Sequence, residues 1–251
     1  GLLDRAEQIL VELKDDPDYE EAALEQLMQI YQQLREWEKA IAVAERLKKR
    51  QGIKAMTPMG HFYCELAEQQ WRRQDAKAAI TLFKKALKAD AGCVRANIRL
   101  ADIHMAGAQW AQAIQCLSRV TEQDADFISE VLPALQRCYR EIGKEEEFIR
   151  QLEQWVAKDS GTSAVLMLAD KIGETQGILS AEQMVLRQLQ RHPTMKGFHR
   201  LMSYHAANAE QGRARESLDM LKSLVAEQIK AKPSHRCGQC GFSSHSLFWQ
   251  C

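Results

Sequence analysis

Residues 24–47 have the sequence LEQLMQIYQQLREWEKAIAVAERL, in which two apolar-rich segments flank the polar pair Arg35 and Glu36. Within each segment the apolar residues recur at the three- and four-residue intervals of an amphipathic helix. A short polar or charged stretch between two such segments is typical of a turn. The sequence therefore predicts two helices joined by a tight turn, a helical hairpin.

The hairpin pattern recurs along the chain. One position of the second helix is a small residue in most hairpins, at Ala6, Ala40, Ala79, Ala113 and Ala181. Phe148 occupies this position between the last two, and successive positions are 34, 39, 34, 35 and 33 residues apart. Leucines of the first helix follow steps of 39, 34, 35, 33 and 33 residues, at Leu27, Leu66, Leu100, Leu135, Leu168 and Leu201. Small residues let paired helices approach closely, and we place the five extra residues of the longest step in a linker, Gly52–Gly60. A fixed period of this length predicts an all-α array of stacked hairpins.

This unit resembles the tetratricopeptide repeat family, most clearly at Leu27, Tyr31, Trp37 and Ala40. The resemblance implies a superhelical solenoid over residues 1–231. The first segment, with Leu3 to Leu13 at helical spacing, matches a second helix whose first helix is missing. We therefore expect a chain truncated upstream, because a repeat is stabilised only by its neighbours.

Composition narrows the classes of function. The chain has 34 basic and 34 acidic residues and no basic block, which disfavours nucleic acid as a partner. No stretch approaches the roughly 18 apolar residues of a membrane span, so we expect this fragment to be soluble. Carboxylate runs lie near turns, and there is no phosphate-binding loop or nucleophile motif. We expect no enzymatic activity.

Residues 232–251 form a second predicted region, in which three of the seven cysteines gather at Cys237, Cys240 and Cys251. A Cys-x-x-Cys-Gly turn can close two thiolates on one metal ion, and a tetrahedral site needs four ligands. The fourth is missing here, although His235 or His245 could supply it, and a redox pair is the alternative. The pattern resembles a truncated rubredoxin-like knuckle that binds iron or zinc.

The repeats, the linker and the ending Cys-x-x-Cys-Gly-Phe…Leu-Phe-Trp-x-Cys together resemble the lipopolysaccharide assembly protein B family of Gram-negative bacteria, as do His61–Cys64 and Arg187–Met195. The resemblance implies an N-terminal membrane anchor, absent here, and a place on the cytoplasmic face of the inner membrane. It also implies an adaptor that promotes degradation of the deacetylase LpxC by the membrane protease FtsH. A homodimer is left open, and an electron carrier, a general repeat scaffold and a zinc-ribbon nucleic-acid scaffold are the alternatives.

First helices of such repeats line a concave surface on which partners bind. Counting from each first-helix leucine, we expect a partner-binding groove, in which Trp71 could instead pack against a neighbouring repeat. Its predicted residues are His61, Glu68, Trp71, Arg72, Arg95, Asp102, Met105, Arg137 and Arg140, with Cys64, Glu130 and Glu141 on the same face. Aromatic and arginine side chains dominate the energies of protein interfaces.

Overall fold

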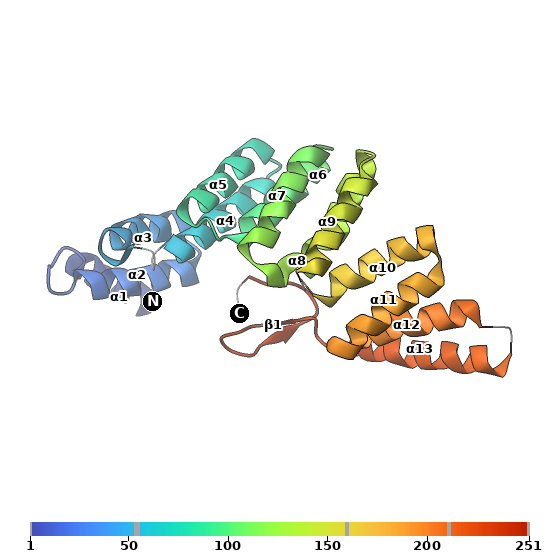
Figure 1. The fold of residues 1–251 in the computed structure, drawn as a ribbon. Coiled ribbons are helices and arrows are strands. Elements are labelled where there is room, and N and C mark those ends of the chain that lie inside the picture. Colours follow the sequence, from blue (N-terminus) through green and yellow to red (C-terminus); the bar gives the residue numbers. More distant parts are fainter. Residues whose placement is uncertain (1, 53–55, 159–160, 210–211, 250–251) are drawn as a thin grey trace. The chain divides into compact units, whose positions relative to one another are not determined.

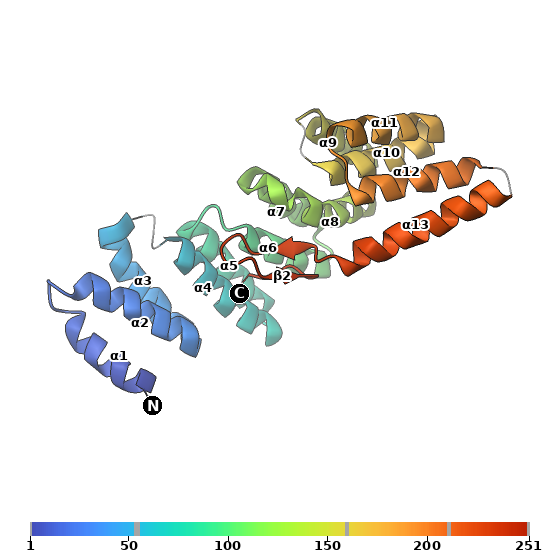
Figure 2. The same cartoon turned by 90° about the horizontal axis from the view of Figure 1, so that it is seen from below.

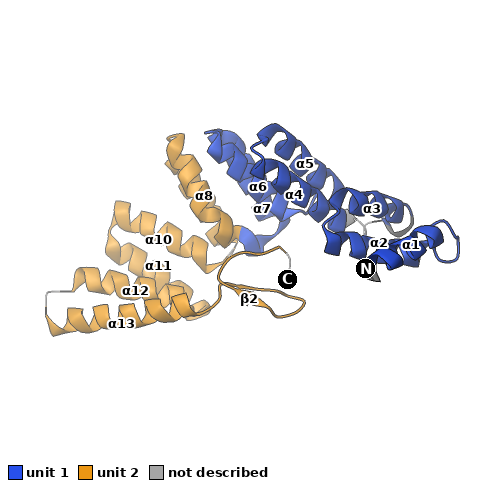
Figure 3. Cartoon of the chain, turned by 180° about the vertical axis from the view of Figure 1, so that it is seen from behind, with its two compact units in different colours: residues 1–127 blue, residues 128–251 orange. Residues whose placement is uncertain are grey.

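The computed structural model describes residues 2–52, 56–158, 161–209 and 212–249. The chain divides into two compact units, Gly1–Phe127 and Ile128–Cys251 (Figure 3). The expected boundary between residues 231 and 232 falls inside the second unit and stays a prediction. No helix among the described residues is long and apolar enough to cross a membrane.

The first unit consists of helices that pair in chain order (Figure 1). α2 packs on α3, α4 on α5, and α6 on α7, while α4 also touches α6. The elements are α1 Leu2–Leu13, α2 Glu20–Leu34, α3 Trp37–Gln51, α4 Met56–Arg72, α5 Ala76–Ala89, α6 Val94–Ala106, α7 Trp110–Gln123 and the 3-10 turn η2 Ala125–Phe127.

The second unit repeats this plan and ends in a small β-hairpin. α8 packs on α9, α10 on α11, and α12 on α13, and α10 touches both α8 and α12 (Figure 2). The elements are α8 Ile128–Glu141, α9 Glu145–Ala157, α10 Thr162–Gln176, α11 Ile178–Arg191, α12 Met195–Asn208, α13 Arg213–Ala231, and the antiparallel strands β1 His235–Arg236 and β2 Ser243–Ser244. The predicted all-α array of helical hairpins is confirmed.

The residues that revealed the repeat form its core. The small residues at Ala40, Ala79, Ala113 and Ala181 are fully buried, and Phe148 fills the same slot. The leucines of the first helices from Leu27 to Leu168 are buried as well. Contact between paired helices at these small residues therefore fixes the spacing of each hairpin.

The turn inside each of the first four complete hairpins shares one geometry. Arg35, Gln74, Ala108 and Gly143 have φ between 55° and 68°. In each case this residue donates its N–H to a carbonyl three residues back, and the next N–H reaches a carbonyl five residues back. This Schellman-type arrangement satisfies carbonyls at the helix end and starts the second helix within two residues.

The linker expected at Gly52–Gly60 is shorter than predicted. α4 already begins at Met56, so Pro58 lies in its first turn. Proline is accepted there because the first N–H groups of a helix have no partner within the helix. Residues 56–60 therefore belong to α4 and not to a linker.

Candidate functional site

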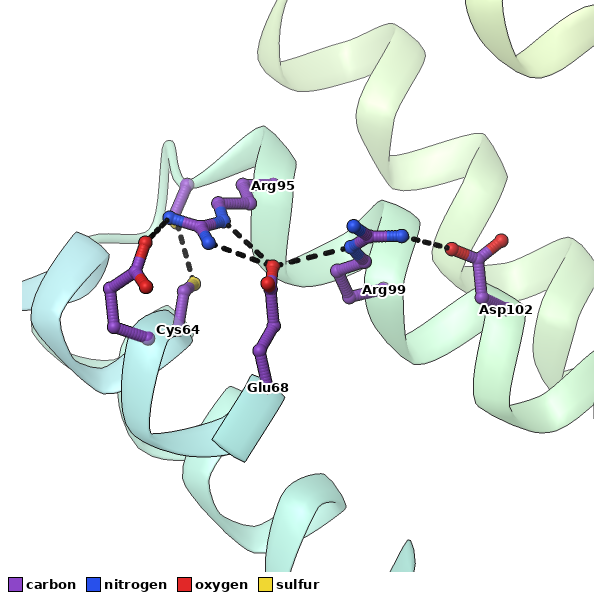
Figure 4. Close-up of polar contacts among 7 residues, drawn as sticks. Cys64, Glu68, Arg95, Arg99 and Asp102 are labelled. Atoms are coloured by element: carbon purple, nitrogen blue, oxygen red, sulfur yellow. Dashed lines mark hydrogen bonds and ion pairs between the residues drawn. The ribbon is translucent and has the colours of Figure 1, made fainter. Parts of the chain in front are cut away.

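A cluster of charges joins α4 to α6 (Figure 4). Arg95 Nη1 lies 2.7 Å from Glu65 Oε1, and its Nη2 lies 2.7 Å from Glu68 Oε1. The Arg95 Nε donates a further hydrogen bond of 3.1 Å to the same Glu68 oxygen. Because one guanidinium holds two carboxylates of the preceding repeat, the cluster ties neighbouring repeats together.

The cluster extends toward solvent through a second arginine. Arg99 Nε lies 3.3 Å from Glu68 Oε1, and Arg99 Nη1 lies 3.2 Å from Asp102 Oδ2. The Arg95 side chain is only 4% exposed, whereas those of Arg99 and Asp102 are each 43% exposed. The buried end of the cluster connects the two helices, and its open end exposes both signs of charge to solvent.

His61 lies one helical turn before Glu65 on α4, close to this cluster. Burial lowers the pKa of His61, and the positive charge of Arg95 lowers it further. Its Nδ1 is buried without a hydrogen-bond partner. His61 is therefore held in its neutral form near neutral pH.

The other predicted groove residues of this unit differ in accessibility. Trp71 is 39% exposed and Arg72 is exposed beside it, while Met105 is half-buried. Two expectations need correction: Cys64 is fully buried, and Arg95 is enclosed by its glutamates, so neither side chain faces solvent. Both lie on the predicted helices, but the adjoining repeat covers them.

In the second unit, α8 carries the remaining groove residues. Arg137 and Arg140 are both exposed. Glu130, near the start of the same helix, lies 3.1 Å from Nε2 of His235 on β1. This contact links the C-terminal hairpin to α8. The predicted groove residues therefore form two groups, one on α4 and α6 in the first unit and one on α8 in the second.

Two of the three cysteines of the predicted metal knuckle, Cys237 and Cys240, lie in the turn between β1 and β2. Cys237 donates its N–H to the carbonyl of Phe242 at 2.7 Å, and Gly241 donates to the carbonyl of Cys237 at 3.0 Å. Gly241 has a φ of 76°, a conformation that favours glycine. The hairpin thus forms the tight turn that the sequence predicted, with Cys240 exposed to solvent.

The donor set of this turn covers half of a four-ligand site. Two thiols are present, and in the described part of the chain no three His, Cys, Asp or Glu side chains gather as metal ligands would. Neither His235 nor His245 joins the two cysteines there. Cys251, the third predicted ligand, lies outside the described residues, so metal binding stays a prediction.

Comparison with known proteins identifies the repeat and its relatives. The tetratricopeptide repeat family matches residues 70–137. Lipopolysaccharide assembly protein B of Escherichia coli strain K12 is 45% identical over 251 residues, which are 100% of this chain and 64% of that protein. This chain is thus similar over its full length to lipopolysaccharide assembly protein B, and part of it matches the tetratricopeptide repeat family. The protein of that name from Haemophilus influenzae is 36% identical over 100% of this chain and 63% of its own length.

This chain therefore spans less than two thirds of the curated lipopolysaccharide assembly proteins that it matches. The stretch matched by the tetratricopeptide repeat family includes Trp71, Arg72 and the α6 end of the charge cluster. It extends to Arg137 on α8. Of the exposed candidate residues, Trp71, Arg72 and Arg137 thus lie within the matched stretch and Arg140 lies just beyond it.

Several residues of the site escaped prediction from the sequence. Glu65 and Arg99 complete the charge cluster, yet neither was among the expected groove residues. A signal was present, because Arg95 and Arg99 stand four residues apart on α6, and Glu65 and Glu68 three apart on α4. Charges at these spacings share one helix face, so two facing pairs of opposite sign could have been matched.

Proposed function

We propose that this chain is part of a non-catalytic adaptor that acts in lipopolysaccharide assembly by binding other proteins. The name of its relatives and the repeat family support this role. Repeat helices of this kind present extended surfaces on which peptides or protein domains can lie. The proposal assigns binding, and no bond-making step, to the exposed ends of α4, α6 and α8.

One observation carries the proposal for the first unit. Trp71 leaves 39% of its surface exposed, one turn beyond Glu68 on the same face of α4. Glu68 belongs to the charge cluster, whose open end is formed by Arg99 and Asp102. An exposed tryptophan near fixed charges of both signs has the composition of an interface centre.

The family resemblance implies two partners, LpxC and FtsH, and we propose that this adaptor binds both. The adaptor would bring the deacetylase LpxC to the membrane protease FtsH on the cytoplasmic face of the inner membrane, and so promote its degradation. A binding surface that holds two proteins together suffices for this task.

Trp71→Ala should reduce recovery of LpxC or FtsH with the full-length protein by tenfold or more, the typical loss at a central interface residue. Arg137→Glu should act similarly from α8, because it reverses the charge of an exposed side chain. Tyr19→Ala, which removes another exposed aromatic of the first unit, is the matched control. Circular dichroism should show unchanged helicity in all three variants.

The cellular readout is the half-life of LpxC. Trp71→Ala should lengthen it, and Tyr19→Ala should leave it unchanged. A Trp71→Ala variant that captures both partners and preserves the short half-life would remove α4 from the binding surface. If the half-life of LpxC is unchanged in cells that lack the whole protein, the proposed role in LpxC degradation is refuted.

We further propose that Cys237, Cys240 and Cys251 supply three of the four ligands of an iron or zinc ion. The tight β1–β2 turn with its two cysteines supports this proposal. When bound, the metal would supply a structural cross-link, since thiolate sites of this kind stabilise small folds. The Phe242 and Phe248 rings, whose centroids are 5.2 Å apart, pack beside the turn.

Cys237→Ser should abolish metal uptake by the full-length protein, measured as metal per chain by elemental analysis. Ser243→Ala, which changes a neighbouring hydroxyl on β2, is the control and should retain metal. Stoichiometric metal in Cys237→Ser would contradict the ligand assignment.

The same cysteine turn supports a second candidate function, an electron carrier. This function requires an iron-type visible spectrum that bleaches on reduction and returns on reoxidation.

A further inference from the structure

Two cysteines of neighbouring repeats meet next to the charge cluster. The Sγ atoms of Cys64 on α4 and Cys93, the residue before α6, lie 3.7 Å apart. Figure 4 shows Cys64 beside Glu68 and Arg95. Cys64 is fully buried and Cys93 is 3% exposed. The charged residues flank them directly, because Glu65 follows Cys64 and Arg95 lies two residues after Cys93.

We propose that Cys64 and Cys93 form a redox pair that closes to a disulfide when a peroxide oxidises it. The sulfur of Cys93, as thiolate, attacks one peroxide oxygen; the O–O bond breaks, and the other oxygen leaves as water after taking a proton. The sulfur of Cys64 then attacks the resulting sulfenic sulfur and displaces its oxygen as a second water. Two thiols and one hydrogen peroxide thus give one disulfide and two waters.

The local structure distinguishes the attacking thiol from its partner. Cys93 is the N-cap residue of α6, where the helix dipole favours a thiolate. The hydrogen bond with Cys64 lowers the pKa of Cys93, and the backbone N–H of Ala96 adds to this effect against the opposing effect of burial. The same hydrogen bond, followed by burial, raises the pKa of Cys64. Cys93 is therefore the nucleophile, and Cys64 resolves the sulfenic acid.

The approach that bond formation requires is small. Disulfide sulfurs lie about 2.05 Å apart, so this pair must close by roughly 1.7 Å. Cys93 lies in the short connection between α5 and α6, directly after the exposed residues Ala91 and Gly92. We expect the adjustment to occur in this connection, and hydrogen peroxide, which is small, to reach the buried Cys93 from its exposed side.

The disulfide would fix α4 to the start of α6, and with them the two sides of the charge cluster. In a reducing compartment such a bond forms only transiently, which is characteristic of a redox-responsive site. The alternative is that both thiols act only as small apolar side chains in the core, as buried cysteines commonly do. The two alternatives differ in the products of oxidation.

The test treats the full chain with hydrogen peroxide, blocks remaining thiols by alkylation under denaturing conditions, and identifies tryptic peptides by mass spectrometry. We expect peptide 55–72 joined to peptide 89–95, at a mass about 2 Da below the sum of the free-thiol peptides, apart from oxygen added to methionines. Reduction should release both. Cys64→Ala and Cys93→Ala should each eliminate the joined peptide, while Cys116→Ala, a control in the same hydrophobic cluster, should retain it.

A second measurement keeps the proposal testable if a variant fails to fold. Oxidised wild-type protein should unfold at a higher urea concentration than reduced protein, and a thiol reductant should restore the lower midpoint. The proposal is overturned if both thiols stay free at a peroxide dose that oxidises the exposed Cys240. Recovery of Cys93 as sulfinic acid without the cross-link, or of Cys93 joined mainly to Cys116, would overturn it equally.

Discussion

Replacing Ala108 by glycine should stabilise the first unit, although glycine normally weakens helical proteins. Ala108 follows α6 with a φ of 55°. It donates its N–H to Met105 at 3.1 Å, and Gln109 donates to His104 at 2.8 Å. These hydrogen bonds require a left-handed residue at position 108, a conformation that costs a residue with a Cβ about 1–2 kcal/mol.

The size of the effect follows from two opposing contributions. Glycine removes the left-handed penalty but loses about 0.5–1 kcal/mol more backbone entropy on folding than alanine does. The methyl group of Ala108 is exposed, so its removal sacrifices no buried contact. We expect a net gain of roughly 0.5–1 kcal/mol in the free energy of unfolding. Gly143→Ala should lose a similar amount, because Gly143 has a φ of 68° and an added Cβ would meet no atom within 4 Å.

Urea unfolding followed by far-ultraviolet circular dichroism measures this difference. With a slope of about 2 kcal/mol per molar urea, the midpoint of Ala108→Gly should rise by roughly 0.2–0.5 M. Ala106→Gly is the matched control, since Ala106 is also exposed but ends α6 in helical conformation. Its midpoint should fall. A fall of the same size in Ala108→Gly would refute the claim that strain is stored in this turn, and hydrogen exchange in α6 and α7 would locate the change.

Two further predictions concern the charge cluster. Arg95→Ala should lower the free energy of unfolding by about 3 kcal/mol, because it leaves Glu65 and Glu68 without their buried cation, whereas Arg99→Ala, a half-exposed control, should cost at most about 1 kcal/mol. Equal losses in urea unfolding would show that Arg95 is not the structural member. Burial and the charge of Arg95 lower the pKa of His61 from its model-compound value of 6.5. The unfolded chain therefore binds the His61 proton more tightly, so His61 contributes stability above pH 6.5 that is lost as pH falls toward the folded pKa. Urea midpoints measured from pH 7 to 5 should decline less steeply in His61→Gln, and an identical slope would assign the dependence to other groups.

The order and pairing of the helices could be predicted from the sequence because the signal was repeated. A single leucine or alanine says little, but the spacing between Leu27 and Ala40 recurs in the next four hairpins, once with Phe148 in place of the alanine, and each copy supports the others. The sequence predicts too late a start for α4, because the signal there is a single residue with no repeated copy. In the sequence Pro58 favours a linker, yet a first helical turn tolerates proline as well as a linker does.

The candidate site could be predicted only to the level of helix and face. The offsets from Leu66 and Leu100 select residues of α4 and α6, but two of these residues, Cys64 and Arg95, are buried. Exposure depends on what the adjacent repeat places opposite a side chain. For Arg95 that is a pair of glutamates from α4, and for Cys64 it is Cys93, so a rule counted along one helix misses both.

The difference in exposure between Arg95 and Arg99 separates a charge that holds the repeats together from one that a partner could contact. Glu68 bonds to the buried Arg95 and also to the half-exposed Arg99, so a partner that draws Arg99 away would compete with a contact that the scaffold itself uses. Binding at the open end, as proposed, would thereby be coupled to the spacing of α4 and α6. A disulfide between Cys64 and Cys93 would fix that same spacing from the buried side, so oxidation should alter partner affinity most when the partner contacts Arg99 and least when it contacts α8.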